Sequence, residues 1–147
     1  MKGADEEVEK AANEEIALQA SRESIVLLKN DKNILPLDAS GIQKIAVCGP
    51  NADEHSYALT HYGPLAVEVT SVLKGIQEKM KGKAEVLYTK GCDLVDANWP
   101  ESELIDYPLT DEEQKEIEKA VDQTKQADVA VVVLLSLIHI SEPTRRR

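Results

Sequence analysis

The fold is decided by residues 44–53, whose sequence is KIAVCGPNAD. A short apolar run, Ile45–Val47, passes directly into a Gly-Pro turn, and this pattern is typical of a buried strand. Pro50 has no amide hydrogen to give to a sheet, so the strand must end just before it. Asn51 and Asp53 then follow the carboxyl end of the strand, which is the edge where open α/β sheets bind ligands.

Downstream of this strand, the sequence alternates between helical and strand patterns. The expected elements are a helix over residues 70–81, a strand over 84–88, a helix over 110–126 and a strand over 129–135. Thr110 opens the second helix with a capping box, because Glu113 stands three positions later. The last strand has no polar alternation, so both of its faces should be covered by other elements.

A charged helix is also expected ahead of the central strand, from Asp5 to about Glu23. One apolar ridge recurs every four residues along it, formed by Val8, Ala12, Ile16 and Ala20. The four large apolar residues Ile25–Leu28 predict either a buried last turn or a short strand. Leu35 and Leu37 flank a proline, and we expect them to fix this extended connection to a hydrophobic surface.

The order of these elements predicts the fold class. Strand, helix, strand, long loop plus helix, and strand make an α/β chain, a βαβαβ unit with right-handed crossovers. This is a partial doubly wound parallel sheet of flavodoxin-like or Rossmann-like type, with a leading N-terminal helix. Three strands are about half of such a domain, so the outer strand expects a further neighbour.

Composition excludes several classes of partner. The 147 residues carry a net charge of −10, with 27 acidic against 17 basic side chains. This balance argues against nucleic acid and against an anionic membrane surface. No apolar run reaches the roughly 20 residues of a membrane span, and the first twenty residues do not form a signal peptide. Cys48 and Cys92 are expected to be buried free thiols rather than a disulfide.

Residues 54–65 have no clear period and carry His55, His61 and Tyr62. They are interpreted as a surface loop, and the alternative is a ligand-facing loop whose polar aromatics both stack and hydrogen bond. The two histidines are not spaced as a helical pair and no third ligand is marked, so we expect no metal site.

Residues 92–108 are too long for a plain strand-to-helix connection, which indicates a loop that has a function or covers something. Their carboxylates suggest calcium, but the spacing is not that of a twelve-residue calcium loop. Trp99 is interpreted as a plug that holds this loop down, with a sugar platform as the alternative.

Two other functions fit the element order. A nucleotide-binding half-domain is disfavoured, because the turn after the first strand lacks the G-x-G-x-x-G spacing. A stand-alone carbohydrate-binding or interaction module would use the same loops without catalysis.

Several stretches also occur in a distinctive order, namely residues 20–30, 34–37, 44–53, 62–63, 69–76, 88–92 and 127–133. Together they resemble the start of the C-terminal domain of family 3 glycoside hydrolases, most closely bacterial β-glucosidases and β-xylosidases. The resemblance implies a retaining, exo-acting β-glycosidase that hydrolyses terminal non-reducing β-linked sugars without a cofactor. Such enzymes use two carboxylates about 5 Å apart.

The resemblance also implies where those carboxylates lie. In the family, the nucleophilic Asp belongs to an N-terminal (β/α)8 barrel, and the acid/base Glu lies downstream of the strand that matches residues 129–134. Neither is expected in this chain, so no catalytic residue is assigned and the fragment itself should be inactive. Substrate binding in the full enzyme is assigned to Asn51, Asp53, His61 and Tyr62, whose alternative role is loop hydrogen bonding.

Three segments follow from this resemblance. Residues 1–37 are a linking helix and extended connection from a missing barrel domain, which would be the intramolecular partner. Residues 38–135 are a partial C-terminal α/β sandwich domain. Residues 136–147 differ in composition and resemble translated sequencing adapter, so they are expected to be non-native. The expected partner is a glycoside substrate, and a periplasmic or secreted bacterial parent is favoured over a cytoplasmic one.

Overall fold

The computed structural model describes residues 2–55 and 69–135, with side chains described from residue 10 onward. The chain divides into two compact units, Met1–Leu37 and Asp38–Arg147.

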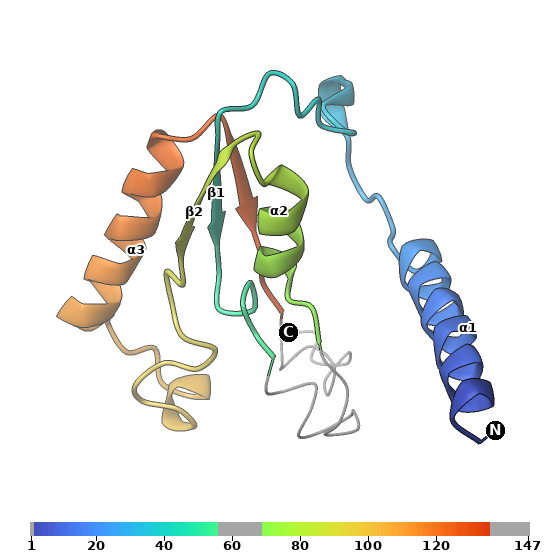
Figure 1. The fold of residues 1–147 in the computed structure, drawn as a ribbon. Helices are drawn as coiled ribbons and strands as arrows, with labels where there is room; N and C mark the ends of the chain where they lie inside the picture. Colours follow the sequence, from blue (N-terminus) through green and yellow to red (C-terminus); the bar gives the residue numbers. More distant parts are fainter. Residues whose placement is uncertain (1, 56–68, 136–147) are drawn as a thin grey trace. The chain divides into compact units, whose positions relative to one another are not determined.

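The first unit consists of one long helix and a short connection. Helix α1 spans Lys2–Glu23, three residues longer at its start than predicted, and a 3-10 turn covers Asp31–Asn33 (Figure 1). The side chain of Asn30 brackets this connection, because it donates to the carbonyl of Leu35 at 2.9 Å and accepts from the amide of Leu35 at 3.0 Å.

The apolar residues of this unit are not buried. Ile25–Leu28 follow α1 without regular structure and all four are exposed, so the prediction of a buried turn or a strand is wrong. Leu35 and Leu37 are exposed as well. Hydrophobicity alone predicts that a segment will be covered, but the residues described in this unit contain no second element that could cover it.

The second unit is a three-stranded parallel sheet with strand order β2-β1-β3 (Figure 1). Its strands are β1 Lys44–Cys48, β2 Glu85–Thr89 and β3 Val129–Val132. In register, Ile45 of β1 pairs with Val86 and with Val129. The predicted α/β fold with a parallel βαβαβ unit is therefore confirmed.

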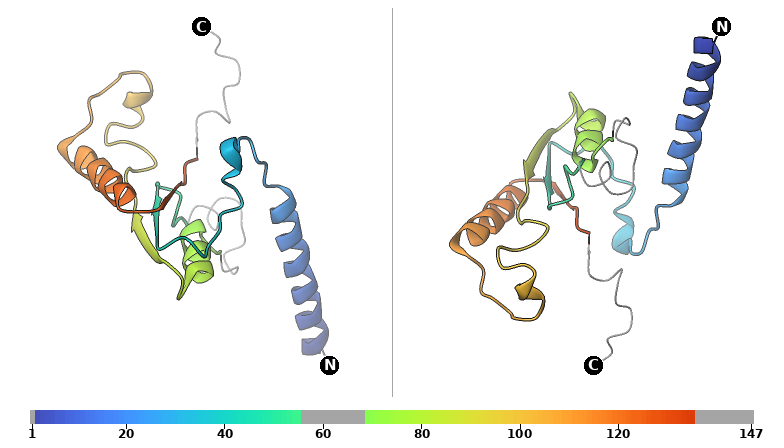
Figure 2. Two further views of the ribbon diagram at one scale, coloured as in Figure 1. Left: turned by 90° about the horizontal axis from the view of Figure 1, so that it is seen from above. Right: turned by 90° about the horizontal axis from the view of Figure 1, so that it is seen from below.

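Two helices connect the strands, α2 Val72–Met80 and α3 Asp111–Lys125. The crossover from β1 to β2 runs in one direction along the sheet, and the crossover from β2 to β3 returns past β1. Right-handed crossovers in opposite directions place their helices on opposite faces, and Figure 2 shows α2 and α3 on either side of the strands.

The core lies between β1 and α2. The buried cluster consists of Ile42, Ile45, Val47, Ala52, Leu73 and Met80. Val47 has no exposed surface at all, as expected for the middle strand of a sheet that is covered on both faces.

Local signals fix the helix ends as predicted. Ser71 caps α2, its Oγ accepting from the amide of Lys74 at 3.1 Å. Thr110 and Glu113 form the predicted capping box, in which Thr110 Oγ1 accepts from the Glu113 amide and Glu113 Oε2 accepts from the Thr110 amide. The turn after α3 is also tied down, because Asp128 accepts hydrogen bonds from two amides at the start of β1.

The third strand differs from its prediction. It ends at Val132 rather than Leu135 and alternates between half-buried and exposed positions, with Val132 59% exposed. The expectation that both faces are covered is wrong for the described residues. The cause is topological, because β3 lies at an edge of the sheet, next to β1 only.

The long loop after β2 is also more open than predicted. Trp99 is 56% exposed, so it does not act as a buried plug, and its Nε1 donates to Glu103 Oε1 at 3.1 Å. Cys48 and Cys92 are both free thiols; Cys48 is buried as expected, but Cys92 is exposed, so the expectation of a buried thiol is wrong for Cys92. None of the helices described here has the length and apolar character that a membrane crossing requires.

Candidate functional site

The candidate site lies at the carboxyl edge of the sheet, between β1 and β3. The crossover that leaves β1 leads to β2 on one side, and the next crossover brings the chain back past β1 to β3 on the other, so the strand order reverses at β1. Such a switch point is where open α/β sheets bind ligands. The loop of residues 49–53 follows β1 at this edge, at the lower end of the strands in Figure 1.

Gly49 makes the close approach of β1 and β3 possible. The Val133 amide donates to the Cys48 carbonyl at 2.8 Å, and the Gly49 amide donates to the Lys90 carbonyl at 3.0 Å. Gly49 has φ +115°, and a Cβ at this position would lie 2.1 Å from the Val133 carbonyl oxygen. Only glycine fits this conformation and this spacing.

Asn51 and Thr89 place two buried, unpartnered oxygen atoms at this edge. Among the residues that the structure describes, Asn51 Oδ1 and Thr89 Oγ1 have no hydrogen-bond partner. Thr89 ends β2 beside Cys48 and is almost fully buried. Buried polar atoms without partners are uncommon in folded proteins and cost free energy, so they indicate a place where a ligand or water donates or accepts. Thr89 was missed from the sequence, because a strand residue carries no local sign of lacking a partner.

Asp53 is engaged in the loop itself. Its Oδ1 accepts from Ser71 Oγ at 2.8 Å and lies 3.1 Å from His55 Nε2. The other ring nitrogen of His55 lies 3.2 Å from the Val69 carbonyl oxygen. The Leu73 amide donates to the Ala52 carbonyl at 2.8 Å, so the β1 loop is joined directly to the start of α2.

The charge of Asp53 also affects the pKa of a residue on the neighbouring strand β2. Burial, and secondarily the negative charge of Asp53, raise the pKa of Tyr88 above its ordinary value. A hydrogen bond to Asp93 raises the pKa of Lys90, and Glu54 adds to this effect. The structure thus brings Asn51 and Asp53 to one edge, as the sequence predicted. His61 and Tyr62 lie outside the described residues.

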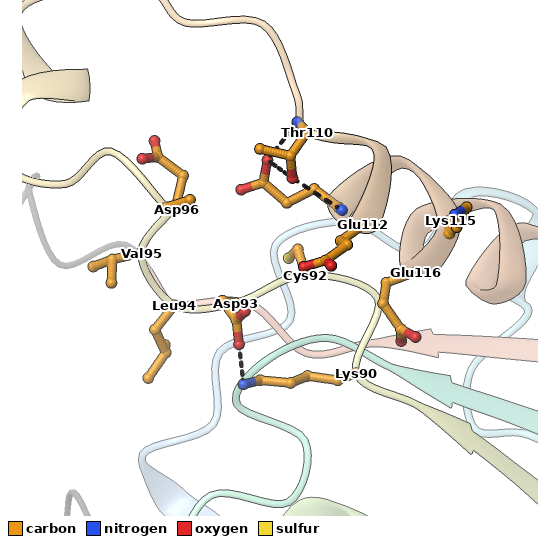
Figure 3. A pocket seen from close by; sticks show the side chains of 12 residues that line it. Lys90, Cys92, Asp93, Leu94, Val95, Asp96, Thr110, Glu112, Lys115 and Glu116 are labelled. Carbon is orange, nitrogen blue, oxygen red and sulfur yellow. Dashed lines mark hydrogen bonds and ion pairs between the residues drawn. The ribbon is translucent and has the colours of Figure 1, made fainter.

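A second hollow lies beside the end of β2 (Figure 3). Its volume is about 840 Å³, and its walls come from residues 90–97 and from residues 110–116 at the start of α3. Asp93 forms an ion pair with Lys90, and Thr110 holds the pKa of Glu113 below its ordinary value through its amide and hydroxyl hydrogen bonds.

This hollow was also missed from the sequence. Glu112, Lys115 and Glu116 in the first turns of α3 line the hollow together with the loop after β2. Across residues 2–55 and 69–135, however, no group of three or more His, Cys, Asp or Glu is arranged to hold a metal ion.

The family of the chain follows from comparison with known proteins. Residues 25–139 match the model of the glycosyl hydrolase family 3 C-terminal domain. The chain belongs to this family. The resemblance noted in the sequence is therefore confirmed.

Relatives of this family 3 domain carry glycosidase names. It is 43% identical over 86 residues to a β-xylosidase of Formosa agariphila, covering 54% of this chain and 12% of the relative. It is 36% identical over 129 residues to the periplasmic β-glucosidase of Salmonella typhimurium, covering 80% of this chain and 16% of the relative.

Solved structures agree with this assignment. A β-glucosidase from intestinal bacteria, described as involved in saponin metabolism, superimposes with a TM-score of 0.64 at 27% identity. That match covers 84% of this chain and 19% of the solved one. The family 3 domain described here thus spans less than a fifth of each of these relatives.

Proposed function

We propose that this family 3 domain forms part of the substrate pocket of a retaining, exo-acting β-glycosidase, a β-glucosidase or β-xylosidase. The substrate would be a terminal, non-reducing β-linked sugar. Family membership and the names of the relatives support the reaction class. The observation that carries the site is the buried, unpartnered Asn51 Oδ1 at the switch point.

A sugar hydroxyl is a suitable partner for this atom. A carbohydrate offers many O–H donors, and an amide oxygen that is already desolvated loses little further hydration when it accepts one. Asp53 would border the same sugar from the next turn of the loop, together with His61 and Tyr62. The assignment of these four residues as substrate-binding remains our proposal.

Hydrolysis itself would need more than this domain. A retaining mechanism requires a nucleophilic carboxylate and an acid/base carboxylate about 5 Å apart, and we assign neither role to a residue of this chain. We propose that they come from the rest of a full-length family 3 enzyme, whose N-terminal barrel would be the intramolecular partner of this domain. We treat residues 136–147 as non-native, which recovery of the flanking DNA would test.

A binding measurement tests the site. The chain is titrated with xylobiose and with cellobiose while its amide NMR signals are recorded. We expect the largest shifts at residues 51–53, and we expect Asn51→Ala to weaken them. Asn98→Ala, in the separate loop after β2, is the matched control and should bind like the wild type. Shifts that are unaffected by Asn51→Ala would contradict the proposed site.

An activity measurement tests the reaction class. The chain alone should not release nitrophenol from 4-nitrophenyl β-D-xyloside or β-D-glucoside, and turnover would contradict our assignment of the carboxylates. Residues 43–132 are then grafted into the Formosa agariphila β-xylosidase in place of the matching segment. Retained turnover supports a glycosidase domain, whereas a folded chimaera that binds sugar without turnover favours a stand-alone carbohydrate-binding module.

A further inference from the structure

Three contacts join the end of the β1 loop to the segment that leads into α2. The Ala52 carbonyl accepts from the Leu73 amide, Asp53 accepts from Ser71, and the ring of His55 lies against both Asp53 and the Val69 carbonyl. Of these, only the His55 contact depends on an imidazole ring, whose number of N–H donors differs between its protonation states.

The two neighbours of the His55 ring are both acceptors. Nε2 lies 3.1 Å from a carboxylate oxygen of Asp53, and Nδ1 lies 3.2 Å from the carbonyl oxygen of Val69. A neutral imidazole has one N–H and one lone pair, so it can donate to only one of the two. The imidazolium donates to both. The geometry is therefore fully hydrogen bonded only when the ring carries both protons.

We propose that His55, as an imidazolium, is a positioning residue that holds Asp53 against the start of α2. Ser71 and His55 share the same Asp53 oxygen, so together they fix the rotamer of this carboxylate. The consequence for sugar binding rests on the proposed function, in which Asp53 borders the glycoside. The bridge between residues 53, 55 and 69 does not depend on that function.

Other titratable groups lie on the same loop and on the neighbouring elements. On the same loop, Asp53 and Glu54 are acidic. From β2 and the turn after it come Tyr88, whose pKa is affected by Asp53, and Lys90, whose pKa is affected by Glu54. Lys74 stands in the first turn of α2. The ring nitrogens themselves face Asp53 and the Val69 carbonyl, so the protons on the ring decide whether both contacts are hydrogen bonds.

A double-mutant cycle tests the bridge. Asp53→Asn, His55→Gln and the double variant are unfolded with urea at pH 5.5 and at pH 8.0. Exposed charged pairs couple weakly, so we expect the unfolding constants to show a coupling factor of about two- to five-fold at pH 5.5. The factor should be smaller at pH 8.0, because a neutral imidazole can still donate one hydrogen bond but not two. Equal coupling at both pH values, or none at pH 5.5, overturns the proposal.

The cross-strand pair Lys44 and Glu85 provides the matched control. Its nitrogen and oxygen atoms are 3.2 Å apart, and it contains no histidine. Glutamine substitutions in the same cycle design should give a coupling factor that is equal at the two pH values. A pH dependence in this control would show that the effect comes from the whole unit rather than from His55.

A spectroscopic measurement keeps the test independent of stability. Ring N–H protons of an exposed imidazolium exchange too fast to be seen, whereas protons donated to protein acceptors are protected. With ¹⁵N-labelled histidine at pH 5.5, we expect N–H signals from both nitrogens of one ring, absent in His55→Gln. Absence of either signal in the wild type contradicts the bridge. The xylobiose titration is repeated on His55→Gln, so that an intact bridge without any sugar binding rejects only the proposed function.

Discussion

Substitution of Gly49 by alanine gives the sharpest test of how β1 and β3 fit together. The new methyl group would lie 2.1 Å from the Val133 carbonyl oxygen, whereas carbon–oxygen contacts in sheets are about 3.3 Å or longer. The end of β3 must therefore move by roughly 1 Å, and the hydrogen bond from the Val133 amide to the Cys48 carbonyl is lost or stretched.

The magnitude follows from two contributions. An alanine held at φ +115° is strained by about 1–3 kcal/mol, and a lost backbone hydrogen bond costs about 1 kcal/mol. We therefore expect Gly49→Ala to lower the free energy of unfolding by about 3 kcal/mol. This corresponds to roughly a hundredfold rise in the unfolding constant.

Two other glycines separate strain from steric clash. Gly82 has φ +73° but open space around its Cβ position, so Gly82→Ala should cost only the conformational strain, about 1 kcal/mol. Gly41 has neither a positive φ nor a close neighbour, and Gly41→Ala should be neutral or slightly stabilising.

Urea unfolding followed by far-UV circular dichroism measures all three variants against the wild type. The expected order of stability is Gly41→Ala, then Gly82→Ala, then Gly49→Ala, with similar urea slopes. If Gly49→Ala is no less stable than Gly82→Ala, the close approach of β1 and β3 does not exist in solution and the argument fails.

Three further predictions concern single contacts. Thr110→Ala removes the capping box and should lower the free energy of unfolding by about 1 kcal/mol, measured by urea unfolding. The amides of Lys44 and Gln43 hold the pKa of Asp128 below its ordinary value. The Asp128 carboxylate therefore stabilises the fold above about pH 3.9, and this stabilisation is lost as the pH falls through the folded-state pKa. Urea unfolding between pH 5 and pH 2 should show the loss in the wild type and not in Asp128→Asn. Val47→Ala should cost about 2 kcal/mol because the side chain is wholly buried, while the exposed Val132→Ala should change stability by less than about 0.5 kcal/mol in the same urea assay.

The parts of the fold that local chemistry determines were predictable. The Gly-Pro turn located the end of β1 within one residue, and the spacing of Thr110 and Glu113 located the start of α3. The outer position of β3 followed from the order of the elements, but its exposure was not predictable, because a run of valines does not reveal how much of its strand other elements cover. The prediction that Ile25–Leu28 are buried was wrong for a related reason, because the burial of a segment depends on other elements that pack against it.

In the candidate site too, residues marked by local signals were predictable and contacts between distant residues were not. Asn51 and Asp53 were placed at the carboxyl edge because a strand end and a proline are both local signals. The contacts of the His55 ring were missed, because one partner is the carbonyl of Val69, fourteen residues away. The only hint in the sequence was the short spacing between Asp53 and His55, which permits contact without requiring it.

The position of β1 in the middle of the sheet has a consequence for how the chain folds during synthesis. Within this unit, the first strand to leave the ribosome is the one that needs both neighbours, and the contact between Gln43 and Asp128 spans 85 residues. The apolar residues of β1 must therefore wait for the rest of the unit before they are covered. Such non-local pairing slows folding and exposes nascent chains to aggregation, so slower translation before β3 would lengthen the vulnerable interval.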